Sequence, residues 1–356
     1  MASVRTADYH TAGEPFRIVD VASTGLAPLP GDTVAERCAT AIGPGGSGTA
    51  PRRGLLDDVR RLLVQEPRGH AGMYGGFIVP PDDDGAHFGV LFWHKDGYST
   101  ACGHGTMALG AWAVDTGRVA APDDGDAQVR IDVPSGRVAA TVHRTGGRTT
   151  GVTFRNVPAR VSARKVPVAT TLGMAEVDIA HAGACYASVR ARDLGLEVSR
   201  AALPELVRAG QEVRAALATH PGTWHPGGPL LSGVYGVILY EELPDTPRAS
   251  AGGTPTLGLH QRNVTVFADG QIDRSPCGSG TSARLALLAE DGRLGAGEDL
   301  LHESVVGTVF TGRVVPGGSG GPGDGLVTEV TGTAYRTGEH TFVLDPQDAL
   351  GAGFLL

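Results

Sequence analysis

Two of the four cysteines lie in a short motif that occurs twice along the chain. Cys102 stands in ACGHGT and Cys277 stands in PCGSGT, and both motifs continue into an apolar stretch of helical character. A Gly-Arg pair follows at the same distance in both copies, at 117–118 and 292–293, and a Phe lies ten residues before each cysteine. We interpret this pattern as a duplicated strand, turn and helix unit that carries one cysteine per copy.

The motif suits proton chemistry next to a carboxylate. A glycine-rich turn that opens a helix leaves several backbone N–H groups without an intrahelical acceptor. Together with the helix dipole, these groups attract an anion and favour thiolate over thiol. If the two copies face each other across a domain interface, one sulfur can remove the Cα proton and the other can return a proton to the opposite face. Because ionising one sulfur disfavours ionising its neighbour, we expect the two to rest in different states.

Two simpler interpretations compete with catalysis. A cysteine at the start of a buried helix is usually structural, and two such cysteines can also form a disulfide. The duplication in one register favours the catalytic interpretation, and a disulfide would conflict with a cytoplasmic setting. The other cysteines, Cys38 and Cys185, lack the motif and are expected to be inert core thiols. The chain has no CxxC or HExxH spacing, so no metal is expected.

The composition excludes several classes of protein. At 356 residues, with 41% hydrophobic and 19% charged residues, the chain is long enough for two globular domains. A net charge of -8 without a basic stripe argues against nucleic-acid binding. The absence of an apolar leader or a long apolar run predicts a cytoplasmic protein that does not contact a membrane. The two lysines, Lys95 and Lys165, lie outside any recognisable cofactor loop, so neither pyridoxal phosphate nor another cofactor is expected.

Strand-like segments outnumber helical ones. The two long apolar helices follow the two cysteines, and amphipathic spacing predicts further helices at 55–65 and 201–218. The loop at 66–76 is rich in glycine yet dense in functional side chains, and the roles of His10 and Glu14, in a turn near the start of the chain, stay open. This order predicts an α+β architecture of two similar halves, each a curved, mostly antiparallel sheet around a helix.

Several motifs together resemble the proline racemase family, which also includes hydroxyproline 2-epimerases and trans-3-hydroxyproline dehydratases. They are HTAGEP, EPRGHAGMYG, GYSTACGHGT, DRSPCGSGTSA, SVVGTVFTGRV and the final GFLL, and they span nearly the whole chain. The resemblance implies two pseudo-symmetric, barrel-like domains with a diaminopimelate-epimerase-like fold. We expect residues 1–134 with about 337–356 to carry Cys102, residues 135–336 to carry Cys277, and the active site to lie at their interface.

The resemblance also implies roles for individual residues. Cys102 and Cys277 match the family's acid/base cysteines, and His104 and Asp273 match residues that contact the ring nitrogen of the substrate. The other matches bind the rest of the substrate: Gly103, Gly278 and Ser279 through backbone N–H groups at the carboxylate, and Phe267 and Tyr74 through aromatic packing on the ring.

These features predict a cofactor-independent racemase or epimerase acting at Cα of proline or 4-hydroxyproline. The dehydratase branch of the family has Thr in place of the second cysteine, so Cys277 favours inversion. Two alternatives stay open: a trans-3-hydroxy-L-proline dehydratase, and an imino-acid-binding protein without catalysis. The expected partner is a small imino acid, and a homodimer is an option. The residues do not decide between proline and hydroxyproline.

Overall fold

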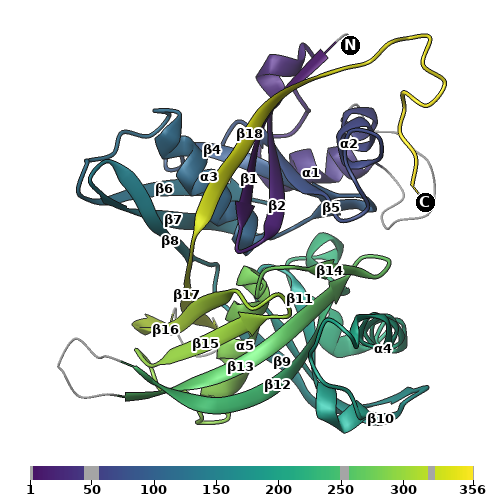
Figure 1. Cartoon of the computed structure of the whole chain (residues 1–356), viewed down its shortest axis with the longest axis vertical. Helices are drawn as coiled ribbons and strands as arrows, with labels where there is room; N and C mark the ends of the chain where they lie inside the picture. The colour runs from purple at the N-terminus through teal and green to yellow at the C-terminus, as the bar shows by residue number, and fades with distance from the viewer. Residues whose placement is uncertain (1–2, 44–55, 249–255, 320–324, 356) are drawn as a thin grey trace. The chain divides into compact units, whose positions relative to one another are not determined.

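The chain folds into two compact units in the computed structural model, which describes residues 3–43, 56–248, 256–319 and 325–355 (Figure 1). Unit 1 comprises residues 1–152 and 333–356, and unit 2 comprises residues 153–332. The sequence analysis placed the first boundary at residue 134 instead. Residues 135–152 stay with unit 1 because the turn at 134–135 is a hairpin: the strand that follows it pairs antiparallel with the preceding strand from Gly125 to Val133.

Unit 1 is a mixed sheet with three α-helices among its described residues. Strand β1 pairs antiparallel with β2 and β18, β3 with β4, β4 with β5, and β6 with β7, whereas β2 with β3 and β4 with β6 are parallel pairs. The elements are β1 (Ser3–Thr11), β2 (Glu14–Asp20), η1 (Val21–Thr24), α1 (Val34–Ile42), α2 (Asp57–Val64), β3 (Tyr74–Val79), β4 (Phe88–His94), β5 (Gly97–Ser99), α3 (Gly103–Asp115), β6 (Gly125–Val133), β7 (Gly136–Thr145) and β18 (Ala334–Val343), together with β8 (Arg148–Arg155), whose last three residues belong to unit 2.

Unit 2 is built from the same kinds of element. Strand β10 pairs antiparallel with β9 and β11, β12 with β13, β13 with β14, and β15 with β16, whereas β11 with β12 and β13 with β15 are parallel pairs. The elements are β9 (Arg160–Thr170), β10 (Gly173–His181), β11 (Cys185–Arg190), η2 (Ala191–Leu194), α4 (Leu203–Ala216), η3 (Pro221–Thr223), η4 (Pro229–Leu231), β12 (Val234–Arg248), β13 (Thr256–Phe267), β14 (Gln271–Asp273), α5 (Gly278–Glu290), β15 (Asp299–Ser304), β16 (Val309–Ser319) and β17 (Leu326–Gly332).

The two units repeat one topology. Each unit begins with a hairpin, β1–β2 or β10–β11, and the next strand, β3 or β12, pairs parallel with the second strand of that hairpin. This strand also pairs antiparallel with the one that follows it, and a short third strand leads into the central helix. The strand after the helix, β6 or β15, then makes a second parallel pair. Even the short 3₁₀ turn after the hairpin recurs, since η1 and η2 both end at a left-handed glycine, Gly25 and Gly195, with φ of 69°. The duplication seen around the cysteines therefore extends over whole units.

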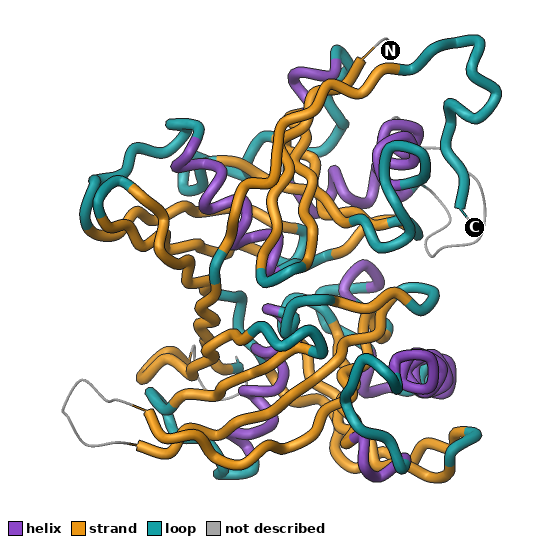
Figure 2. Tube along the Cα trace, in the orientation of Figure 1, coloured by secondary structure: helices purple, strands orange, loops and turns teal. Residues whose placement is uncertain are grey.

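The central helices α3 and α5 are buried on all sides. Every residue of α3 from Gly103 to Val114 is buried, and so is every residue of α5 from Gly278 to Leu288. Helices of this kind form the core of a domain rather than covering its surface. Helix α3 contacts β1, β2, β6, β7 and β18, and α5 contacts β9, β10, β11, β16 and β17, so each sheet curves around its helix (Figure 2).

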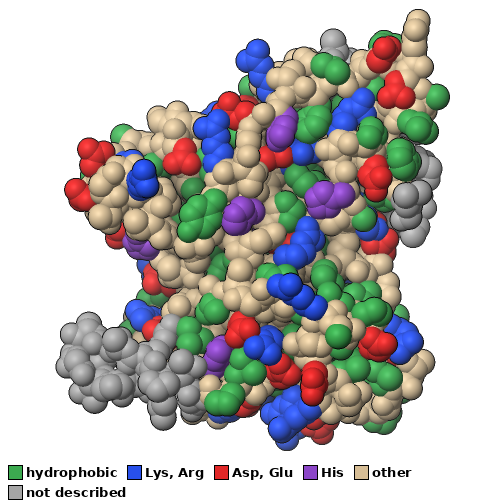
Figure 3. Space-filling view, viewed as in Figure 1, with side chains coloured by type: hydrophobic (Ala, Val, Ile, Leu, Met, Phe, Trp, Pro, Cys, Tyr) green, Lys and Arg blue, Asp and Glu red, His purple; other side chains and the backbone are tan. Residues whose placement is uncertain are grey.

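The remaining helices cover the sheets. Helix α4, predicted at 201–218, packs on β9, β12 and β13 through its buried side chains, Leu206, Ala209 and Val213 among them. Helix α2 confirms the helix predicted at 55–65, although residue 55 lies outside the described residues. Figure 3 shows positive and negative side chains intermixed on the visible surface of each unit. Among the described residues, no helix has the length and apolarity needed to cross a membrane.

A buried ion pair joins the elements of unit 1. The Arg17 guanidinium donates from Nη2 to Asp8 at 2.7 Å and from Nη1 to the carbonyl oxygens of Leu63 at 2.7 Å and Arg68 at 2.8 Å. Its carbon lies 4.4 Å from the centre of the Phe342 ring on β18. Arg17 and Asp8 are both 6% exposed. The guanidinium therefore connects β1, β2, the end of α2 and β18.

Removing one partner of this pair should destabilise unit 1 strongly. Asp8→Ala leaves a buried guanidinium without its counter-charge, which typically costs about 3–5 kcal/mol, and we expect a clear fall in the melting temperature by circular dichroism. The matched control is Glu339→Ala, which removes an exposed pair with Arg336 on β18 and should cost about 0–1 kcal/mol. Equal melting temperatures for the two variants would contradict this role of Arg17.

Candidate functional site

Cys102 caps the first turn of α3. Its backbone is extended, with φ of -155°, and its Sγ accepts a hydrogen bond from the N–H of Gly105 at 3.2 Å. The sulfur thus takes the place that a Ser or Asp oxygen holds at most helix N-termini. A sulfur in this position lies in the positive field of the helix N-terminus, which favours the thiolate. Cys102 is 6% exposed.

His104 lies directly beside this sulfur. The distance from Cys102 Sγ is 3.4 Å to His104 Nδ1 and 3.7 Å to Nε2. The imidazole meets the rings of Phe16 and Tyr74 edge-on, with centroids 5.8 Å and 5.0 Å away. Thr11 on β1 also donates its hydroxyl to the His104 carbonyl at 2.9 Å. The surrounding rings and this hydrogen bond hold the imidazole against the sulfur.

Tyr74 belongs to the same group of side chains as His104. It is the first residue of β3, is 2% exposed, and packs on Phe16 and His94 with centroids 6.2 Å and 5.8 Å away. Gly103, the first residue of α3, presents its N–H in the first turn of the same helix. Of the residues predicted from the sequence, Cys102, Gly103, His104 and Tyr74 therefore come together in unit 1.

Cys277 is the N-cap residue of α5, but its side chain makes no cap hydrogen bond and its backbone has a different conformation. Its φ is +65°, which is uncommon for any residue other than glycine. Asn263 donates to the Pro276 carbonyl at 3.2 Å, and the Thr281 hydroxyl donates to the Cys277 carbonyl at 2.8 Å. Such backbone strain persists where the surroundings hold it, and it occurs often at functional sites.

The Cys277 sulfur has an acidic neighbour. Burial, and then the charge of Asp273, raise the pKa of the Cys277 thiol well above its usual range. The Asp273 carboxylate is 5% exposed and accepts hydrogen bonds from the Ser275 N–H at 2.8 Å and hydroxyl at 2.7 Å. Burial raises the pKa of Asp273 to about 6. The two cysteines therefore share a position at a helix start but differ in their neighbours.

Aromatic side chains surround this second sulfur. Tyr186 Oη lies 3.8 Å from Cys277 Sγ, and the Tyr186 ring meets Tyr235 edge-on at 5.9 Å. Tyr235 in turn stacks on Phe267, the predicted ring-packing residue, at 5.8 Å. The sequence analysis missed both tyrosines. The duplication pointed to Tyr186, because it lies on the second strand of its hairpin, and the second strand of the corresponding hairpin in unit 1 places Phe16 beside His104.

Ser279 presents an unsatisfied hydroxyl at the start of α5. The residue is 1% exposed, and its Oγ has no hydrogen-bond partner within the described part of the chain. A buried polar atom left in this way is costly. Gly278 and Ser279 are the first two residues of the helix, where backbone N–H groups are also available. A bound anion such as a carboxylate would satisfy both kinds of donor.

The other two cysteines lie apart from these groups. All four cysteines are free thiols, so the structure contains no disulfide between Cys102 and Cys277. Cys38 and Cys185 are buried, and burial raises the pKa of each thiol to about 12. Within the described ranges, no group of three or more His, Cys, Asp or Glu side chains could hold a metal ion. Glu14, in the first hairpin, is fully buried rather than an exposed loop residue.

Comparison with known proteins gives a consistent result. A family model described as proline racemase matches residues 6–355. The chain is 41% identical over 356 residues to a trans-3-hydroxy-L-proline dehydratase of Burkholderia cenocepacia, covering 99% of this chain and 98% of that protein. It is 40% identical over 355 residues to a 3-hydroxyproline 2-epimerase of Burkholderia multivorans, covering 99% and 98%.

A solved structure confirms the predicted fold class. The crystal structure of a hydroxyproline epimerase from Agrobacterium vitis, with bound trans-4-hydroxy-L-proline, superposes with a TM-score of 0.86 at 28% identity. The match covers 100% of this chain and 95% of that chain. The α+β fold with two pseudo-symmetric domains is therefore shared with this epimerase.

The close approach at Gly105 predicts a selective effect on Cys102. A Cβ at Gly105 would lie 2.4 Å from Phe16 Cε2 and 2.8 Å from Cys102 Sγ, so Gly105→Ala must displace the sulfur or the ring. We expect slower alkylation of Cys102 by iodoacetamide, measured by peptide mass spectrometry. The control is Gly110→Ala on the same helix, whose Cβ would lie 2.6 Å from Ala140 Cβ. It should lower stability by about 1–3 kcal/mol and leave the Cys102 rate unchanged. A slower Cys102 rate in both variants would contradict the local explanation.

The raised pKa of Asp273 predicts a pH-dependent gain in stability for Asp273→Asn. The pKa of this carboxyl is about 6 in the folded protein and about 3.9 in the unfolded chain. The protonated carboxyl therefore stabilises the fold at low pH, and this contribution is lost as the pH rises through 6. Asn cannot ionise, so the variant should be more stable than wild type at pH 8, by up to about 3 kcal/mol. The difference should shrink as the pH falls to 4.

Thermal unfolding at several pH values measures this difference. Asp84→Asn, which changes an exposed aspartate, controls for the loss of one negative charge and should give no comparable gain. A variant that is less stable than wild type at pH 8 would show that the Asp273 charge is favourable in the fold.

Proposed function

The chain belongs to the proline racemase family, and from this premise we propose that it is a cofactor-independent racemase or epimerase that inverts Cα of a proline or hydroxyproline. The observation that carries the proposal is the pair of cysteine caps. Cys102 and Cys277 each occupy the N-terminus of a buried central helix, in two units of the same topology. Each sulfur has a neighbour able to tune its proton affinity, His104 in one unit and Asp273 in the other.

In the proposed reaction both cysteines act on one substrate molecule, one from each unit. A thiolate removes the Cα proton and becomes a thiol, and the electron pair left on Cα spreads onto the carboxylate. The other cysteine gives its thiol proton to the opposite face of Cα and becomes the thiolate. The substrate is inverted, no proton is gained or lost overall, and the two sulfurs have exchanged states. A positioned acid or base of this kind typically contributes about 10² to 10⁴ in rate.

The larger contribution must come from holding the carboxylate. Its charge increases when Cα loses a proton, and each well-placed donor in such a site is worth roughly 2.7–4 kcal/mol. The first-turn N–H groups of Gly103, Gly278 and Ser279 are the proposed donors, and the unsatisfied Ser279 hydroxyl is a further one. These donors are already ordered by the two helices, so they need no rearrangement during the reaction.

The substrate nitrogen and ring need separate contacts. Above a pH of about 6 the Asp273 carboxylate is ionised, which suits a cationic imino group, and His104 is the second proposed contact to the nitrogen. Phe267 and Tyr74 are the proposed packing surfaces for the ring. A hydroxylated ring is favoured over proline itself because the relatives described above are named for hydroxyprolines, or bind one.

A second candidate is dehydration of trans-3-hydroxy-L-proline. It is supported by the relative at 41% identity that is named for that reaction. Here one thiolate removes the Cα proton, the 3-hydroxyl leaves and is released as water after it accepts a proton, and the unsaturated product becomes a cyclic imine. The second cysteine is then not needed as an acid, so the presence of Cys277 favours inversion.

Incubation in D₂O should separate these reactions. We expect L-proline, trans-4-hydroxy-L-proline or trans-3-hydroxy-L-proline to be inverted with deuterium at Cα, as followed by NMR and chiral chromatography. Cys102→Ser and Cys277→Ser should each reduce inversion by at least about 10²-fold. Cys185→Ala, which changes a buried cysteine outside both clusters, should retain activity where the fold is intact.

Each other outcome has a defined meaning. Full activity in either serine variant would refute the two-cysteine mechanism. Formation of the cyclic imine without inversion would establish the dehydratase. A measurable dissociation constant without deuterium exchange at Cα would indicate a binding protein.

A further inference from the structure

The two cysteines have different contacts at their helix starts. Cys102 Sγ accepts the Gly105 N–H at 3.2 Å, whereas the Cys277 side chain makes no cap hydrogen bond at the start of α5. Both residues are 6% exposed. The cap hydrogen bond and the neighbouring side chains therefore distinguish the two sulfurs. On the basis of the proposed function, we infer that Cys102 is the thiolate of the resting enzyme and Cys277 is the thiol.

The imidazole beside Cys102 stabilises a negative sulfur. His104 Nδ1 is the nearer nitrogen, at 3.4 Å, and its N–H is a donor to the thiolate in the Nδ1–H tautomer. In that neutral tautomer Nε2 is an acceptor, which suits a substrate N–H group. Around the ring lie Phe16, Tyr74 and, in contact with Tyr74, His94.

The carboxylate beside Cys277 has the opposite effect. The Asp273 carboxylate accepts from the Ser275 hydroxyl at 2.7 Å, and the Ser275 oxygen accepts the Cys277 N–H at 3.1 Å. The charge of this nearby carboxylate raises the pKa of the Cys277 thiol. A thiolate at Cys277 would set two negative charges close together in a buried site.

Thr265 is a further neighbour of Cys277. Asn263 Nδ2 donates to the carbonyl oxygens of Pro276 and Glu303, both at 3.2 Å, so its Oδ1 faces Thr265 Oγ1 at 3.3 Å and accepts the Thr265 proton. A hydrogen bond from Thr265 lowers the pKa of the Cys277 thiol, and the Asn263 acceptor competes for that single proton.

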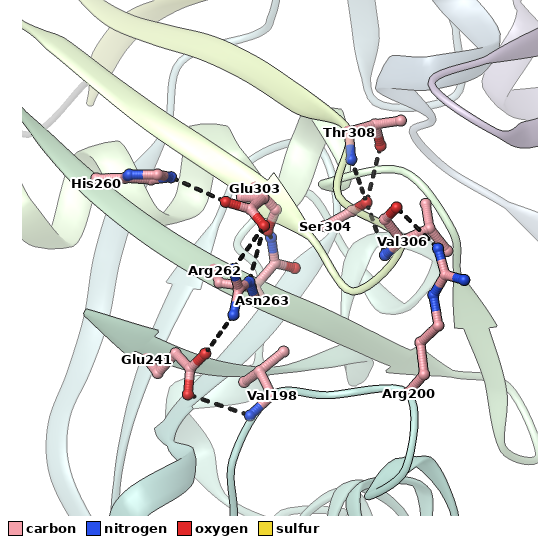
Figure 4. Close-up of polar contacts among 10 residues, drawn as sticks. All are labelled: Val198, Arg200, Glu241, His260, Arg262, Asn263, Glu303, Ser304, Val306 and Thr308. Carbon is pink, nitrogen blue, oxygen red and sulfur yellow. Dashed lines mark hydrogen bonds and ion pairs between the residues drawn. The ribbon is translucent and has the colours of Figure 1, made fainter. Parts of the chain in front are cut away.

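Ion pairs lie next to Asn263. Figure 4 shows Arg262 and Asn263 beside Glu303. The Glu303 carboxylate accepts from Arg262 Nε at 2.9 Å and lies 3.2 Å from His260 Nε2, and Arg262 also reaches Glu241 at 3.2 Å. These contacts join β13 to β15 at the residues next to Asn263.

Tyr186 contacts the same sulfur. In the thiol form Cys277 Sγ donates to Tyr186 Oη at 3.8 Å, which is long, and a neutral hydroxyl has a weaker effect than the full charge of Asp273. Tyr186 thus does not reverse the resting state. It provides a donor for Cys277 after that residue has given up its proton, so the enzyme form produced by each turnover is also stabilised.

The inference has a stereochemical consequence. The resting enzyme accepts first the enantiomer whose Cα hydrogen faces Cys102. The other enantiomer needs the form in which the sulfurs have exchanged states.

Ultraviolet absorbance of thiolate, titrated from pH 5 to 9, tests the assignment without substrate. The neutral-pH thiolate signal of the wild type should disappear in Cys102→Ser and persist in Cys277→Ser. Iodoacetamide labelling with peptide mass spectrometry should then give a labelling rate for Cys102 whose pH midpoint is lower than that for Cys277. At pH 7, Cys102 should be labelled about tenfold or more faster than Cys277, as a separation of one pKa unit requires. The midpoint, unlike the rate, does not depend on how accessible each sulfur is.

Asp273→Asn isolates the proposed cause. It keeps the size of the side chain and should lower the Cys277 midpoint while the Cys102 midpoint stays. His104→Gln should raise the Cys102 midpoint only. A lower midpoint for Cys277 than for Cys102 in the wild type, equal midpoints, or an Asp273→Asn variant with an unchanged Cys277 midpoint would each overturn the inference. If no imino acid is turned over but the midpoints differ as expected, only the proposed function fails.

Discussion

The structure depends on one constraint: a helix buried on all sides still has a first turn whose N–H groups need acceptors. In α3 and α5 no water-exposed loop is available at that turn, because the residues around it are buried. At α3 the Cys102 sulfur supplies one acceptor, and the remaining donors of the two helices are the proposed carboxylate cradle. In this proposal the same N–H groups that a buried helix leaves unsatisfied also hold the charged substrate.

Duplication gives the two units this capping problem in common, and their divergence gives them different solutions. Unit 1 places an imidazole beside its sulfur, whereas unit 2 places a carboxylate, a threonine and a tyrosine there. The backbones differ too, extended at Cys102 and left-handed at Cys277. Two nearly equal thiols would compete for the same proton. Unequal neighbours instead give each sulfur a defined state at each stage of the proposed cycle.

The parts of this arrangement that repeat along the chain could be predicted from the sequence. The cysteine motifs, the central helices and the α+β class all follow from local patterns that occur twice. Tyr235 and Asn263 could not be found in this way, because their contacts with Tyr186 and with the Pro276 and Glu303 carbonyls depend on how the strands pair. The boundary at residue 134 was misplaced for a related reason: a Pro-Ser-Gly turn looks the same whether it joins two domains or the two strands of a hairpin.

The place of β18 bears on how the chain acquires its structure during synthesis. Unit 2 is a single continuous segment, 153–332, whereas unit 1 needs β18, from the far end of the chain, beside β1. Domains tend to fold as units while the chain is made, and contacts between distant segments form late. Unit 2 can therefore complete its core while unit 1 still lacks an edge strand and the Phe342 ring that covers Arg17. The half of the protein that begins first is the half that finishes last.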